Sequence, residues 1–156
     1  MPASGVATTV PPMDDRQRVS SGSPWELTVG YSRALRVGDR VFVAGTAPKW
    51  SDGEVDPDPA AQARKCVEII ADALDRVGSS LRDVVRTRMY LVDAADFEAI
   101  GAVHGEMMSE AMPVNTTVRQ TLETRGSKGE ARLYFGGEKA SAVEAALANG
   151  TAAHAS

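Results

Sequence analysis

Cysteine, aromatic residues and concentrated positive charge are all scarce in this chain of 156 residues. The single cysteine, Cys66, cannot form an internal disulfide, which is typical of a protein kept in a reducing compartment. The 17 Lys and Arg residues are scattered among 21 Asp and Glu residues, and the net charge is −4. Because nucleic-acid binding needs a concentrated basic face, the composition argues against a nucleic acid as the main partner.

Long apolar runs and metal-ligand clusters are also missing. No run approaches the roughly 18–20 apolar residues that span a bilayer, and the N-terminus lacks the segments of a secretory signal. We therefore expect a cytoplasmic protein with no membrane partner. The histidines, His104 and His154, and the one cysteine lie too far apart for a recognisable metal site. No phosphate-binding glycine loop or nucleophile motif is present, so the sequence predicts no metal and no cofactor.

Both ends of the chain differ in composition from its middle. Residues 1–24 are rich in Ser, Thr, Pro and Gly and show no apolar period, which predicts a flexible N-terminal arm. Residues 138–156 are rich in Ala with few large apolar groups, which predicts a frayed tail with a short helix over about 141–148. The folded domain is then expected over residues 25–137.

Inside this domain, apolar residues alternate between the period of a strand and that of a helix. The expected order is ββαβαββ, with strands over about 31–37, 41–44, 84–92, 115–122 and 131–135, and helices over about 60–77 and after Asp93. This order predicts an α+β fold in which the helices cover one face of a mixed sheet. The face carrying Arg88 and Tyr90 would then lie opposite the helices and need cover, most simply from a partner subunit.

Five blocks resemble the YjgF/RidA/UK114 family, in order and at the family's spacing across about residues 30–118. They are Gly-Tyr-Ser-Arg-Ala from 30, Val-Phe-Val-Ala-Gly from 41, Gln-Ala-Arg from 62, Gly-Ser-Ser-Leu-Arg-Asp-Val-Val-Arg-Thr from 78, and Asp93 to Phe97. The resemblance implies a chorismate-mutase-like fold and a homotrimer with ligand clefts between subunits. It also implies hydrolysis of reactive 2-enamines and 2-imines to keto acids and ammonia.

The chain departs from the family in the cleft motifs. Asn115 stands where the family has a carboxylate-binding arginine, and Met112 stands where one branch places its arginine instead. Thr117 corresponds to the family's cysteine, and Tyr134 to the glutamate that helps to place water. The resemblance therefore supports the fold more strongly than the standard deaminase chemistry.

Several residues are candidates for the cleft. The resemblance places Tyr31 where the family's tyrosine hydroxyl binds a polar ligand end. Tyr31 is therefore a catalytic candidate, together with Asn115 and Tyr134, which stand at the family's arginine and glutamate positions. Gly45 and Thr46 could offer backbone N–H groups, or Gly45 could simply mark a bend. The remaining binding candidates project from the strands: Arg88, Tyr90, Thr117 and, with less support, Arg119.

Some of these residues have a structural alternative. Arg88 could bind a carboxylate in place of the missing arginine, or form an ion pair at a subunit interface. Asn115 and Thr117 could hydrogen-bond a neutral or weakly charged ligand. His104 is interpreted as a hydrogen-bonded packing residue, and Cys66 as an inert core residue.

Two classes of function remain open at this stage. One is a deaminase acting on a small enamine or imine, or a divergent pathway enzyme with another substrate. The other is a protein that binds a small metabolite without turnover, which the missing arginine and glutamate favour. Ribonuclease activity is disfavoured because the chain is acidic and has no basic, aromatic-rich surface.

Overall fold

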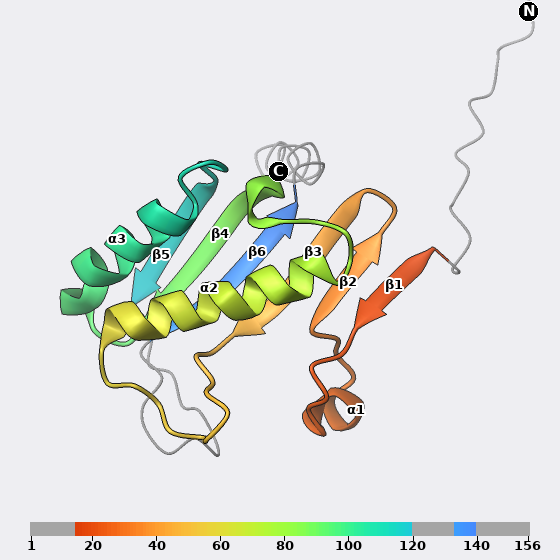
Figure 1. Cartoon of the computed structure of the whole chain (residues 1–156), viewed down its shortest axis with the longest axis horizontal. Helices are drawn as coiled ribbons and strands as arrows, with labels where there is room; N and C mark the ends of the chain where they lie inside the picture. The colour runs from red at the N-terminus through yellow and green to blue at the C-terminus, as the bar shows by residue number, and fades with distance from the viewer. Residues whose placement is uncertain (1–14, 120–132, 140–156) are drawn as a thin grey trace, which may run out of the picture.

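A computed structural model describes residues 15–119 and the backbone of residues 133–139. The elements are β1 (Arg16–Val19), α1 (Trp25–Val29), β2 (Ala34–Val37), β3 (Arg40–Thr46), α2 (Pro59–Asp75), the 3₁₀ turn η1 (Leu81–Asp83), β4 (Val84–Leu91), the 3₁₀ turn η2 (Ala94–Asp96), α3 (Phe97–Met107), β5 (Val114–Arg119) and β6 (Leu133–Lys139). The described strands form one six-stranded sheet in the order β1-β2-β3-β6-β4-β5 (Figure 1).

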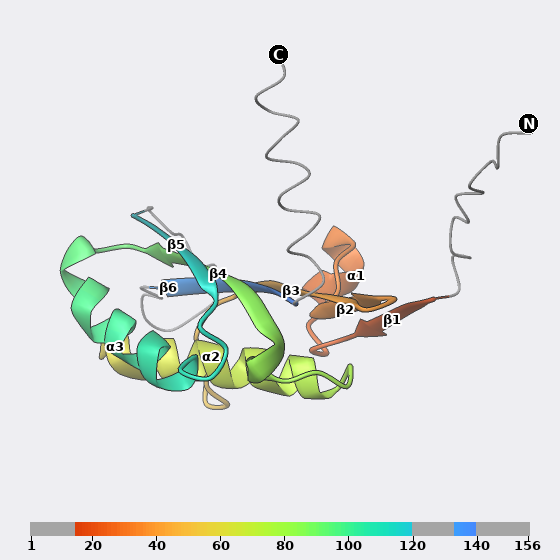
Figure 2. The ribbon, with the colours of Figure 1, turned by 90° about the horizontal axis from the view of Figure 1, so that it is seen from above.

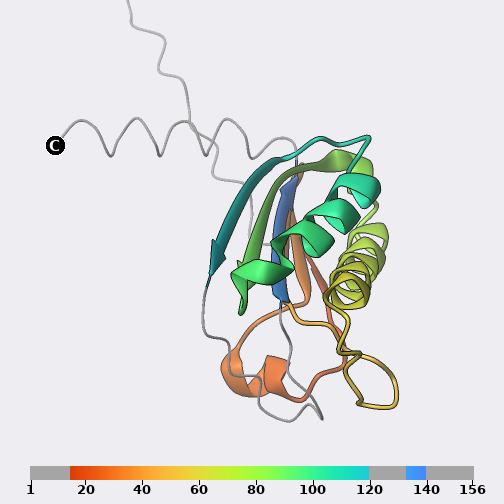
Figure 3. The same cartoon turned by 90° about the vertical axis from the view of Figure 1, so that its left-hand side faces the viewer.

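The sheet is mixed, and the two long helices lie on one side of it. Only the pair β4 and β5 is parallel, and every other neighbouring pair is antiparallel. Figures 2 and 3 show α2 and α3 packed against the same face, while the short α1 lies on the other side at the β2 end. The α+β class and the placement of the two expected helices on one face are therefore confirmed, with the expected ββαβαββ order preceded by the strand β1 and the short helix α1.

The predicted boundary of the N-terminal arm is wrong, because Arg16–Val19 form β1 and pair with β2 along their whole length. The sequence does not predict this strand because only Val19 among its residues is buried, so no apolar alternation marks it. Backbone pairing to the edge of β2 holds it instead. At the other end, β6 runs to Lys139, two residues beyond the expected domain limit, and the expected helix over 141–148 lies outside the described residues.

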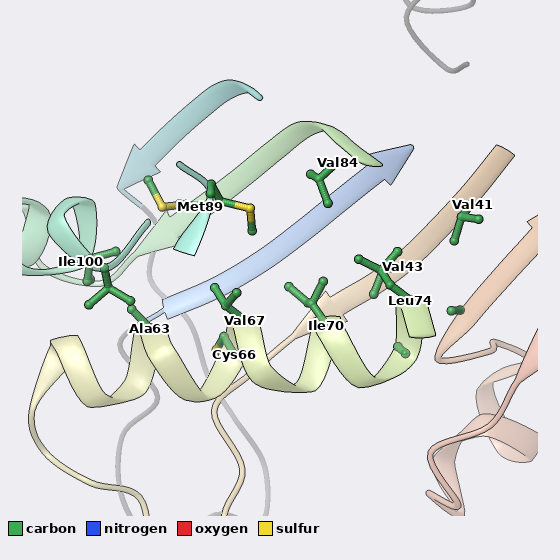
Figure 4. Close-up of a cluster of buried hydrophobic side chains, with 14 of the residues drawn as sticks. Val41, Val43, Ala63, Cys66, Val67, Ile70, Leu74, Val84, Met89 and Ile100 are labelled. Carbon is green, nitrogen blue, oxygen red and sulfur yellow. The ribbon is translucent and has the colours of Figure 1, made fainter. Parts of the chain in front are cut away.

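The core lies between the sheet and the two helices. Figure 4 shows the apolar face of α2 pointing at the sheet, and the labelled residues from this face are Ala63, Cys66, Val67, Ile70 and Leu74. They contact the inward side chains of β3 and β4, which include Val41, Val43, Val84 and Met89. Burying one such aliphatic side chain contributes about 1.5–3 kcal/mol, so this layer is the main source of stability.

Local sequence signals set the ends of α2. The Asp58 carboxylate accepts hydrogen bonds from the backbone N–H groups of Ala60 and Ala61, and Pro59 occupies the first turn, where its missing N–H costs nothing. Gly78 adopts a φ of 69° just beyond the helix, a conformation that favours glycine. The predicted helix over about 60–77 and its glycine stop are thereby confirmed.

Candidate functional site

A chain of hydrogen bonds links β5, β4 and α3 at one edge of the sheet. The Thr117 hydroxyl donates to Asn115 Oδ1 at 2.7 Å, and Asn115 Nδ2 donates to Thr87 Oγ1 at 2.9 Å. Thr87 Oγ1 in turn lies 2.9 Å from His104 Nε2. Asn115, the residue at the family's arginine position, is therefore held from two sides.

The parallel register of β4 and β5 explains how this chain forms. Thr87 is paired with Asn115, and Met89 with Thr117, so both β5 residues lie on the face that α3 covers. Residues at alternate positions of a strand share one face, and the hydrogen bond between Asn115 and Thr117 shows that their side chains point the same way. β5 is an edge strand, and Asn115 remains exposed while Thr87 is buried.

His104 comes from the last turn of α3 and lies half-buried against Thr87. Burial lowers the pKa of the His104 imidazole, so its neutral form is favoured in the folded protein. Sequence reasoning identified His104 as a hydrogen-bonded packing residue, but not its connection to Asn115. The available signal was Thr87, a polar residue at an inward position of a strand whose next inward residues are apolar.

Arg88 and Tyr90 lie on the opposite face of the sheet. Thr87, Met89 and Leu91 are buried under the helices, whereas Arg88 is exposed and Tyr90 half-buried, as the alternation predicted. Among the described residues Arg88 has no ion-pair partner. Within one chain the sheet therefore separates Arg88 from Asn115, and the two side chains of the same chain cannot share a ligand.

Tyr31 is also remote from Asn115 within the chain. It lies in the segment between α1 and β2 and is 41% exposed, whereas Asn115 lies on β5 at the far edge of the sheet. Four strand spacings separate β2 from β5, which amounts to roughly 19 Å. A ligand that touches both residues would therefore have to lie between two subunits.

Gly45 and Thr46 end β3, where the register with β6 shifts between Val43 and Thr46. Gly45 thus lies within an irregularity of the strand pairing, whereas Thr46 is fully buried and its hydroxyl is already engaged. The Arg33 guanidinium donates to Thr46 Oγ1 at 2.8 Å, to Gly45 O at 3.2 Å and to Ala44 O. Arg33 thus occupies the carbonyl oxygens at this irregularity.

Two candidates from the sequence analysis remain, Tyr134 and Arg119. Tyr134 is paired with Tyr90 across β6 and β4, and its side chain lies outside the described residues. Arg119, at the end of β5, donates to the Val92 carbonyl at 3.4 Å. Within residues 15–119 and 133–139, no group of three His, Cys, Asp or Glu side chains could hold a metal ion. None of the helices in this part of the chain is long and apolar enough to cross a membrane.

Comparison with known proteins gives the class of protein to which this fold belongs. The family model described as Endoribonuclease L-PSP matches residues 24–130. A Mycobacterium tuberculosis structure, described as a member of the YjgF/YER057c/UK114 family, is 36% identical and superimposes with a TM-score of 0.69 over 80% of this chain and 98% of that one. The chain therefore belongs to the YjgF/RidA/UK114 family.

Two further relatives differ in whether their names give a function. An uncharacterized protein of Streptomyces coelicolor is 39% identical over 64% of this chain and 75% of its own. A 3-aminoacrylate deaminase, RutC of Acinetobacter baylyi, is 34% identical over 59% of this chain and 75% of its own. The family thus includes a protein named as an enamine deaminase.

Proposed function

We propose that this protein hydrolyses a small reactive enamine or imine to a carbonyl compound and ammonia, in a cleft completed by a neighbouring subunit of a homotrimer. The observation that carries the proposal is the hydrogen-bonded chain at the family's arginine position, where Asn115 is held between Thr117 and Thr87, and Thr87 in turn contacts His104. Membership of the family and the 3-aminoacrylate deaminase relative supply the reaction class.

The reaction requires a series of proton transfers and no redox step. Protonation of the enamine carbon with loss of an N–H proton gives the imine. A water oxygen then bonds to the imine carbon while the π electron pair moves to nitrogen, and a proton passes from the added water to that nitrogen. The resulting carbinolamine transfers its hydroxyl proton to nitrogen, breaks the C–N bond and releases ammonia and the carbonyl product. The protein must orient the substrate and place the water beside a group that relays protons.

The candidate residues suit the orienting part of this task. Asn115 and Thr117 offer fixed amide and hydroxyl groups on an exposed edge strand. Tyr31, also exposed, offers a phenolic hydroxyl, and the distance across the sheet means that it would come from the neighbouring subunit. Exposed apolar residues near it, among them Trp25, Leu27 and Val29, are suited to burial in such an interface.

Ammonia release from freshly generated 2-aminoacrylate and 3-aminoacrylate tests the proposal. We expect hydrolysis above the uncatalysed rate but weak, because a bidentate guanidinium contact to a carboxylate is typically worth about 1.5–3 kcal/mol and is missing at Asn115. Asn115→Arg should therefore raise the activity on these acids about ten- to a hundredfold. If the wild type and Asn115→Arg are both inactive while the oligomer is unchanged, the deaminase proposal is rejected.

A second candidate function is binding of a small metabolite without turnover. It is favoured by the bond between Thr117 and Asn115 Oδ1, which uses the amide oxygen that would otherwise help to hold water. In that case a ligand would raise the melting temperature while no product accumulates. Measuring both quantities in the same samples separates the two candidates.

A further inference from the structure

The donor and acceptor roles along the chain from Thr117 to His104 follow from counting hydrogens. Thr87 Oγ1 has one hydrogen and accepts from Asn115 Nδ2, and Thr87 is only 2% exposed. A buried hydroxyl hydrogen needs an acceptor, and the other partner of Thr87 Oγ1 is His104 Nε2. Thr87 therefore donates to His104, Nε2 carries no hydrogen, and the neutral imidazole carries its hydrogen on Nδ1.

This direction has a consequence at the exposed end of the chain. Because Asn115 Nδ2 faces Thr87, its amide oxygen faces Thr117 and takes the Thr117 hydrogen. Asn115 then has its second amide hydrogen left for a ligand, and Thr117 Oγ1 has its lone pairs left. If the hydrogen bonds ran the other way, with Nε2 donating to Thr87, the Asn115 N–H would face Thr117. The hydrogen of the Thr117 hydroxyl would then be left to donate to a ligand.

We propose that His104, acting through Thr87, is a positioning residue that fixes the Asn115 amide, so that the site selects a neutral ligand with an acceptor next to a donor, such as a primary amide, over a carboxylate. An amide can accept from Asn115 through its carbonyl oxygen and donate to Thr117 through its N–H. A carboxylate has acceptors only, so one of its oxygens would face the lone pairs of Thr117. This inference rests on the site of the proposed function and names its substrate class.

The hydrogen position on His104 is the first test, read from the ¹⁵N chemical shifts of its ring in protein labelled at histidine. The protein has two histidines, and His154→Gln assigns the signals. In the wild type we expect Nε2 of His104 to be bare. Asn115→Asp offers only acceptors to Thr87, whose hydrogen turns away from His104, so Nε2 should gain a hydrogen.

Three further variants make this test specific. Thr116→Asp adds the same charge one residue away, on the face paired with Arg88, and should leave Nε2 bare. Combining Asn115→Asp with Thr87→Val removes the intervening hydroxyl, so the aspartate should no longer cause Nε2 to gain a hydrogen. Combining Asn115→Asp with Thr87→Ser keeps a hydroxyl, so Nε2 should again gain a hydrogen. The proposal is overturned if Asn115→Asp leaves Nε2 bare, or if Thr116→Asp has the same effect.

Ligand preference is the second test, and stable product analogues serve as probes. Pyruvamide and pyruvate differ in the amide that replaces the carboxylate, and their dissociation constants can be measured by NMR titration of the wild-type protein. We expect pyruvamide to bind about tenfold more tightly, a preference that Thr87→Val loses and Thr87→Ser keeps. Equal or tighter binding of pyruvate to the wild type overturns the proposal.

Neither readout uses turnover, so the two proposals fail separately. A hydrogen shift on His104 and a preference for pyruvamide without any ammonia release would reject the deaminase and keep the positioning role. Ammonia release by a protein in which Nε2 does not respond to Asn115→Asp would keep the deaminase proposal and reject the positioning role.

Discussion

Arg33 Nη2 donates to Thr46 Oγ1 at 2.8 Å and so joins the residue before β2 to the last residue of β3. The same nitrogen contacts the carbonyls of Ala44 and Gly45, at the point where β3 departs from regular pairing with β6. Burial lowers the pKa of the Arg33 guanidinium, which shows that its charge is partly removed from water. These contacts link the start of β2 to the irregular end of β3.

Replacing Arg33 with lysine should lower the free energy of unfolding by about 1–3 kcal/mol, because the lysine side chain ends one bond short of the position of Nη2 and its more strongly hydrated ammonium is less suited to burial. Chemical denaturation measures the loss. Arg18→Lys is the control, since Arg18 is exposed on β1. Equal stabilities of the two variants would show that the Arg33 contacts contribute nothing to the fold.

Cys66 should resist thiol reagents in the native protein. Its side chain is fully buried in α2 and its Sγ lies 3.4 Å from the Thr46 carbonyl oxygen, while burial raises the pKa of the thiol. Because Cys66 is the chain's one cysteine, labelling of the whole protein reports on it alone. We expect labelling only as the protein unfolds in denaturant, and rapid native labelling would contradict the inert role.

Acid should destabilise the wild type through His104. Its pKa is lowered in the folded state, so below the ordinary value of about 6.5 the unfolded chain binds more protons than the folded one. Stability should therefore be complete above that pH and fall as the pH drops through it. His104→Gln should show a smaller loss between pH 7.5 and 5.5 in denaturant titrations. Parallel pH dependences would contradict this assignment.

Glu26 should anchor α1 to the segment before it. Its carboxylate accepts from the hydroxyls of Ser20 and Ser21 and from the Ser21 backbone N–H, and these bonds lower the pKa of Glu26. The resulting stability is present above the ordinary Glu pKa of about 4.3 and is lost as the pH falls through the lowered value. Glu26→Gln should speed hydrogen exchange in α1 at neutral pH, whereas Glu98→Gln, on the surface of α3, should leave α1 unchanged.

A homotrimer remains a prediction from the family resemblance and from the uncovered sheet face. Phe42, 38% exposed between the buried Val41 and Val43, lies on that face. Light scattering should give three times the 16.5 kDa chain mass at micromolar concentration. Phe42→Asp should weaken the assembly, and Ala102→Asp on the exposed side of α3 should not. A stable wild-type monomer would remove the intersubunit site as well.

Patterns within short stretches of sequence were enough to predict most elements. The 3.6-residue period from Ala63 to Leu74, with its Asp58 cap and Gly78 stop, specified α2, and the alternation from Thr87 to Leu91 specified which face of β4 is buried. Both signals depend on neighbours within a few residues, so no tertiary information was needed. The five sequence blocks that resemble the family predicted the fold as a whole, and the comparisons confirm this prediction.

Only the tertiary structure decided which distant residues meet. β1 carries no apolar alternation, and its backbone pairing depends on the position of β2. The contact of His104 with Thr87 requires α3 to lie over β4, and the contact of Asn115 with Thr87 requires the parallel register of β4 and β5. The sequence by itself determined the residue types at the candidate site and their faces. Their order in one hydrogen-bonded chain, and the separation of Asn115 from Arg88 and Tyr31, came from packing between elements far apart in sequence.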